Sequence, residues 1–248
     1  AAHFPLTLVF GSYRTPFSLL TPDEIRHDAH PSCDPFAAYW EALAAFLAAE
    51  RVGMVGVSVA FPGQLQPAFS MAYALRARLP DVHLAAGGPA LTQLLAHLPP
   101  DRAARMLGPF HSAVLFEGDE AIVDLARAVA AGRAPSGVMR GAMAIDLSDL
   151  PAPDFQGVWT GHHLAPSPVL PYDPSRGCWW GRCAFCHYGL AEAGTARFRE
   201  RPADRVAADV AVLAREFGCR IVYFSNDSLS PRLASAIAAR LSAQGVPV

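Results

Sequence analysis

The chain of 248 residues is long enough for one large domain or two of ordinary size. Hydrophobic residues make up 52% of it, which allows a sizeable core and argues against disorder throughout. The formal net charge of −2 is spread without runs of one sign, and no apolar run approaches the roughly 20 residues of a membrane span. Nucleic acid and membrane are therefore not expected as partners.

Short apolar strands alternate with helical segments in the first half of the chain. Strands are predicted at 54–60, 82–88 and 113–116, where apolar runs end in small or polar residues. Helical periodicity follows the first of these from Pro67, and follows the third after about residue 120. This alternation predicts an α/β fold with a doubly wound parallel sheet. A further strand is predicted at 6–10.

Ligands of such sheets bind beyond the carboxyl ends of the strands. Those ends are Ser58 to Pro62, Gly87 to Pro89, and Glu117-Gly118. Glycine there allows a ligand to approach the backbone, but βα turns also favour Gly and Pro without any ligand. Both interpretations stay open. His83 lies inside a predicted strand, which favours a packed, hydrogen-bonded histidine.

A composition rich in Gly, Pro and Ala predicts a linker at 136–167, between a domain at 1–135 and a second at 168–248. In the second domain a helix is predicted at 201–218, from near Pro202 to Gly218. A buried strand follows at 219–227, then a helix at 233–245 and the beginning of another strand.

Three of the five cysteines lie in SRGCWWGRCAFCHYG, residues 175–189: Cys178, Cys183 and Cys186. An odd number of cysteines with three close together is a poor disulfide framework and a good metal cluster. Zinc is disfavoured because its fourth ligand would be His187, and adjacent residues such as Cys186 and His187 rarely reach one tetrahedral ion. Inert core cysteines are disfavoured by the surrounding Gly and Arg.

Residues 183–187 also match the C-x-x-C-H motif for haem attachment, but no export signal is visible and Cys178 would have no role. A 4Fe–4S cluster fits better, because three thiolates leave one iron open to a small molecule. A loop directly after a strand is also where the catalytic groups of βα barrels lie.

The stretch G-C-W-W-G-R-C-A-F-C resembles the cluster loop of radical S-adenosylmethionine (SAM) enzymes, with C-x4-C-x2-C in place of the usual C-x3-C-x2-C. FRERP at 198–202, the helix after it and the strand IVYFSND are also similar to that family. The resemblance implies that Cys178, Cys183 and Cys186 hold a 4Fe–4S cluster whose open iron chelates SAM. It places Phe185 near the adenine, and Ser225, Asn226 and Asp227 near the SAM amino group. Asp227 has an alternative role as a helix N-cap.

The first half resembles the cobalamin-binding domain that precedes many radical SAM enzymes, through VGVSV, AAGGP, FEGDE and the linker LSDLPAPDF. By position, the resemblance implies a corrinoid site lined by Ser58, Gln64, Gly87, Gly88, Glu117 and Gly118. The D-x-H-x-x-G motif that supplies a histidine to cobalt in other cobalamin proteins is absent from the sequence.

Together the resemblances imply an α/β protein: a doubly wound cobalamin-binding-like, Rossmann-like domain, then the first part of a partial (βα)6 radical SAM barrel. The implied activity is a cobalamin-dependent radical SAM enzyme, expected to be a methyltransferase: SAM methylates cobalt, and a 5′-deoxyadenosyl radical activates an unactivated carbon. Rearrangement or peptide maturation is the alternative reaction, and a non-catalytic metal-binding or electron-transfer protein the alternative class.

The implied partners are a small-molecule or peptide substrate and an electron donor such as a flavodoxin or ferredoxin. No secretory signal is visible in the sequence, so a cytoplasmic location is expected. Residues 168–248 contain fewer βα units than a barrel needs, and the first strand of the cobalamin domain is missing. The sequence is therefore expected to be a fragment that cannot catalyse alone.

Overall fold

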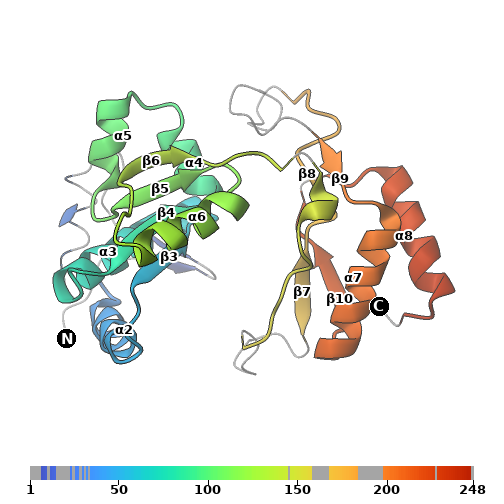
Figure 1. Ribbon diagram of the computed structural model, residues 1–248, viewed down its shortest axis with the longest axis horizontal. Helices are drawn as coiled ribbons and strands as arrows, with labels where there is room; N and C mark the ends of the chain where they lie inside the picture. Colours follow the sequence, from blue (N-terminus) through green and yellow to red (C-terminus); the bar gives the residue numbers. More distant parts are fainter. Residues whose placement is uncertain are drawn as a thin grey trace. The chain divides into compact units, whose positions relative to one another are not determined.

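The computed structural model describes residues 34–144, 146–157, 168–183, 198–226 and 228–246. It also describes 7–9, 12–14, 26–27 and the single positions 23, 30 and 32. The chain divides into two compact units, residues 1–142 and 143–248 (Figure 1). Within the described residues, we find no helix with the length and apolar character that a membrane crossing requires.

A four-stranded parallel sheet forms the centre of the first unit (Figure 1). Its strands lie in chain order: β3 (Met54–Ser58), β4 (His83–Gly87), β5 (Ser112–Leu115) and β6 (Gly137–Arg140). The helices that precede, connect or follow these strands are α2 (Ala37–Ala49), the 3₁₀ turn η1 (Pro62–Gln64), α3 (Leu65–Arg78), α4 (Pro89–Leu95), α5 (Pro100–Leu107) and α6 (Asp119–Ala130). The predicted α/β fold with a parallel sheet is confirmed, and it is compatible with a Rossmann-like domain.

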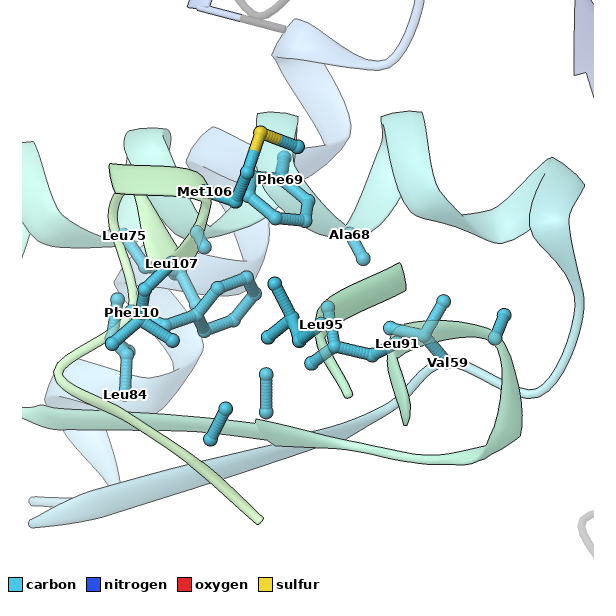
Figure 2. Close-up of a cluster of buried hydrophobic side chains, with 14 of the residues drawn as sticks. Val59, Ala68, Phe69, Leu75, Leu84, Leu91, Leu95, Met106, Leu107 and Phe110 are labelled. Carbon is cyan, nitrogen blue, oxygen red and sulfur yellow. The ribbon is translucent and has the colours of Figure 1, made fainter. Parts of the chain in front are cut away.

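One face of this sheet carries the main hydrophobic core. Alternate strand residues such as Leu84 and Leu115 point to this face and pack against side chains of α3, α4 and α5. Phe69 of α3 meets Phe110 edge to face, with ring centroids 5.2 Å apart, at the centre of the cluster (Figure 2). The burial of these side chains fixes the positions of the strands, and the carboxyl ends of the strands form the candidate site.

The opposite face of the sheet is covered by α6. A Cβ on Gly56 of β3 would lie 3.9 Å from the end of Ile122, and Leu125 of α6 is almost fully buried. Ala85 and Val114, which alternate with the core residues of β4 and β5, are buried on this face. Helices on both faces are what a doubly wound sheet requires.

His83 is buried in β4, as the sequence predicts for a packed histidine. Its Nε2 lies 2.8 Å from Ser112 Oγ, and its ring stacks on that of His111 at 5.1 Å. His111 Nδ1 accepts a hydrogen bond from the backbone N–H of Leu84 at 2.9 Å. The pair is a structural element between β4 and β5.

The second unit contains one βαβ unit of parallel strands. Strand β7 (Val169–Tyr172) pairs with β10 (Ile221–Phe224), and helix α7 (Ala203–Phe217) connects them. Helix α7 ends at Gly218 in the left-handed conformation, as predicted. Helix α8 (Pro231–Ala243) follows and packs beside α7 over a shared core that includes Val206, Val210 and Ile237 (Figure 1).

Two predicted segments contain features that the sequence did not indicate. The strand predicted at 6–10 forms as β1 (Thr7–Val9), but it pairs antiparallel with β2 (Ser12–Arg14) and is not part of the four-stranded sheet. The linker predicted at 136–167 contains β6, and the units divide at residue 142, with Leu147 buried in the second. The Gly- and Pro-rich composition hid β6, because such a short strand has little periodicity to detect.

The histidine pair predicts how stability depends on pH. Burial lowers the pKa of His83, and burial followed by the charge of Arg76 lowers that of His111. Because the folded-state pKa lies below the unfolded value of 6.5, the unfolded chain takes up protons before the folded protein does. The stability that is fully present above pH 6.5 is therefore lost as the pH falls below this value. We expect the urea midpoint to drop between about pH 7.5 and about pH 5.5, and to drop less in His83→Gln. His97→Gln, at an exposed position, is the control and should show the same drop of the urea midpoint with pH as the wild type. An equal change of this drop in both variants would contradict the prediction.

Candidate functional site

The sequence-predicted corrinoid residues meet at the carboxyl edge of the first sheet. Ser58 ends β3 and is exposed, and it pairs in register with Gly87 at the end of β4. Glu117 and Gly118 follow β5 and are half-buried. Parallel strands bring their carboxyl ends to one edge, so these residues lie along the same edge of the sheet.

Gly87 and Gly88 are required by the fold itself. Gly88 has φ +96°, and a Cβ there would lie 2.6 Å from the carbonyl oxygen of Val59 and 2.7 Å from its nitrogen. A Cβ on Gly87 would lie 3.0 Å from the carbonyl oxygen of Val114. Close packing of one βα turn against its neighbours explains both glycines. A bulky residue at Gly88 would harm folding before it could report on a ligand.

Gln64 holds the turn after β3. Its side-chain oxygen accepts hydrogen bonds from the backbone N–H groups of Ala60 and Phe61, at 2.9 and 3.0 Å. This oxygen therefore shapes the loop that borders the edge, and contact with a ligand would have to come from the amide nitrogen.

Phe116 is a residue of this edge that the sequence analysis missed. Its φ of +67° is strained for a residue with a side chain. The Thr92 hydroxyl accepts its backbone N–H at 3.0 Å, and the Arg140 guanidinium lies 3.9 Å over its ring. A Cβ on Gly141 would fall 1.6 Å from the carbonyl oxygen of Glu117, so this glycine is also required. No sequence pattern marks a left-handed aromatic residue.

The cysteine loop of the second unit begins and ends at a pair of short strands. Strand β8 (Ser175–Arg176) pairs antiparallel with β9 (Arg199–Glu200), so residues 177–198 leave and return at one place. The Ser230 hydroxyl, which caps α8, donates to Glu200 at 3.0 Å and anchors this closure. Ser230, and not Asp227, is therefore the N-cap of α8.

Two of the three predicted cluster ligands lie in the described part of the loop. Cys178 and Cys183 are both half-buried. The backbone N–H of Gly181, which has φ +57°, donates to Cys178 Sγ at 3.4 Å. An N–H···S bond of this kind stabilises a thiolate ligand. Cys186, Phe185 and Asp227 lie outside the described residues, as does Cys33.

Cys219 is a structural cysteine. It is almost fully buried, and its Sγ lies 2.9 Å from the carbonyl oxygen of Ile221 and 3.4 Å from that of Pro168. This position at the amino end of β10 is opposite to the cysteine loop, because the loop follows the carboxyl end of the parallel strand β7.

The end of β10 meets the first residues of the cysteine loop. The Ser225 hydroxyl donates to Asp173, and Asn226 Nδ2 donates to the Ser175 hydroxyl at 3.0 Å. Ser175 lies three residues before Cys178. Among the described residues, the buried Ser228 hydroxyl meets no hydrogen-bond partner. This polar cluster, just before the cysteine loop in sequence, offers groups that a polar ligand could bind, and the unsatisfied Ser228 hydroxyl is one more such group.

A buried ionic network fixes the carboxyl end of β7. The Tyr172 hydroxyl donates to Asp209 of α7 at 2.7 Å, and burial followed by this bond raises the pKa of Tyr172. Arg205 donates to both oxygens of Asp209 at 2.9 and 3.0 Å, and Arg201 lies 3.8 Å away. Both arginines also donate to backbone carbonyls of 148–151, so the network holds this segment on α7.

No protein-family model, no curated protein and no solved structure matches the chain.

The Asp209 network predicts a large loss of stability when its charge is removed. Asp209→Asn keeps the shape but leaves the buried Arg201 without a counter-charge, which should cost about 3 kcal/mol in urea unfolding. Hydrogen exchange at 147–150 should accelerate, because the arginines that hold this segment lose their own anchor. Asp101→Asn removes an exposed ion pair with Arg105 and should cost less than about 1 kcal/mol. Similar losses in both variants would show that the network contributes little.

Proposed function

We propose that this protein is a cobalamin-dependent radical SAM enzyme that methylates an unactivated carbon. The observation that carries the proposal is the contact between Asn226 and Ser175. It brings the polar end of β10, predicted to bind SAM, to the beginning of the loop that carries the cysteines.

The donor set of the cysteine loop fits an iron–sulfur cluster. Cys178 and Cys183 lie in a loop closed by β8 and β9, and the sequence supplies Cys186 as the third thiolate. Three thiolates leave one iron for a ligand that is not protein. When bound, the cluster would supply the electron that cleaves SAM.

The chain's own groups would position SAM. Ser225 and Asn226 follow β10 and contact Asp173 and Ser175 just before the cysteine loop, so they would donate hydrogen bonds to SAM, and the buried Ser228 hydroxyl is a further candidate. Asp173 accepts from Ser225 and would orient its hydroxyl. These residues bind and orient; the bond-breaking chemistry would belong to the cofactors.

The carboxyl edge of the first sheet is where a corrinoid would bind, because ligands of such sheets bind beyond the carboxyl ends of the strands. Ser58 is exposed there, and Gly118 has room for a Cβ at 3.6 Å from Val114. Gly87 and Gly88 support the site only indirectly, since the fold already requires them. Ser58, Glu117 and Gly118 are therefore the residues that would face a bound corrinoid.

Anaerobic reconstitution of the full chain should yield about four irons and four sulfides per chain. Replacing Cys178, Cys183 or Cys186 by Ala should abolish the cluster, measured as iron, sulfide and visible absorbance. Cys219→Ala is the matched control and should retain it, because Cys219 packs at the other end of β10. Stoichiometric zinc without sulfide in the wild type would refute the cluster and favour a non-catalytic metal-binding protein.

Corrinoid binding should be blocked by bulk at the end of β3. Ser58→Trp places an indole at an exposed position on the predicted site and should lower retention of hydroxocobalamin in equilibrium dialysis by about tenfold or more. Ala130→Trp is the control, since Ala130 is exposed at the far end of α6. A folded wild-type chain that retains no corrinoid would leave a radical SAM enzyme whose first unit is only structural.

A further inference from the structure

The first unit holds the connecting chain further than the end of its last strand. Strand β6 ends at Arg140, and the next backbone N–H, that of Gly141, still donates to the carbonyl oxygen of Leu115 in β5 at 2.8 Å. The linker that composition predicts at 136–167 is therefore part of the first unit as far as Gly141.

The second unit binds the connecting chain from Ala144 onward. Arg199 of β9 is buried, and its guanidinium donates to the carbonyl oxygen of Ala144. Leu147 is almost fully buried, and Arg205 of α7 donates to the carbonyl oxygen of Ser148 at 3.4 Å. Two cations and one apolar side chain thus attach this segment to the second unit.

Ala142 and Met143 lie between these two anchored ends. Ala142 is exposed, and within the described part of the chain neither residue makes a hydrogen bond or an ion pair. We infer that Ala142 and Met143 are a hinge about which the two units turn. Arg199, Leu147 and Arg205 form a clamp that keeps this hinge two residues long. Hinges of this kind are a few residues at the ends of elements, whose φ and ψ angles absorb the motion.

The length of the hinge decides how freely the two units turn and how often they meet. The mean span of a flexible segment grows with the square root of its number of residues, so two residues span about 8 Å, whereas a free segment from 136 to 167 would span about 30 Å. The effective concentration of one unit at the other falls steeply as such a segment lengthens. The clamp therefore restricts the motion to rotation about one short stretch and keeps each unit available to the other.

Double electron–electron resonance on the full chain measures the spread of distances between the units. Spin labels are attached to ketone-bearing amino acids at the exposed positions Arg102 of α5 and Ser235 of α8, because the five native cysteines rule out thiol labels. Leu147→Ala/Arg199→Ala frees residues 142–147 and should widen the distance distribution by about 1.7-fold. Four Gly and Ser residues inserted after Ala142 give a free segment of equal length with the clamp intact, and should widen the distribution equally.

Arg215→Ala, which removes an exposed arginine of α7, is the control and should keep the wild-type distribution. A double variant that is folded by circular dichroism and also keeps the wild-type distribution overturns the clamp. If the double variant does not fold, Arg199→Ala alone should widen the distribution by a smaller factor, and no widening overturns the clamp. A wild-type distribution as wide as that of the insertion variant overturns the two-residue hinge. A distribution that stays narrow after the insertion also overturns it, because the units would then form one rigid body.

Discussion

The second unit is organised around one buried carboxylate, that of Asp209. Removing a carboxylate from water is costly unless it is paired and hydrogen-bonded. Asp209 has both kinds of partner: the Tyr172 hydroxyl from β7, and Arg205 one turn earlier on α7. Satisfying this charge connects the strand, the helix and the segment 148–151, which lie far apart in sequence.

The position of the cysteine loop follows from that network. Tyr172 is the last residue of β7, so its hydrogen bond fixes where the chain leaves the strand. The next residues then meet the end of β10, through Asp173 with Ser225 and Ser175 with Asn226. Pairing of β8 with β9 closes the loop behind them. The protein thus fixes the two ends of the loop, and a bound metal centre would fix the thiolates between them, which couples metal binding to folding.

Sequence reasoning succeeded where a segment is long and periodic. The strands at β3, β4 and β5 and the helices α7 and α8 have enough apolar repeats to be recognised. It failed where a few residues depend on tertiary partners. Strand β6 is four residues in a Gly- and Pro-rich stretch, and it forms only because β5 is there to pair with it.

The same difference between local patterns and tertiary contacts applies to the candidate sites. The cysteine spacing and the polar end of β10 are local patterns, and they could be found from the sequence. The burial of Asp209 could not, because Asp209 occupies a helix position where a solvent-exposed carboxylate would look the same. The left-handed Phe116 could not be found either, since its strain is maintained by Thr92 and Arg140 from other elements.

The carboxyl edge of the first sheet differs from a dinucleotide site in its charge. A pyrophosphate binds at a helix N-terminus, where backbone N–H groups and the helix dipole favour negative charge. The first turn of α6 instead contains Asp119 and Glu120, two carboxylates that would repel phosphate at this end of β5. Close packing against Val114 and Val59 already requires the glycines at Gly87 and Gly88. The edge therefore combines an exposed serine with carboxylates, groups that accept hydrogen bonds from neutral donors and do not favour a phosphate.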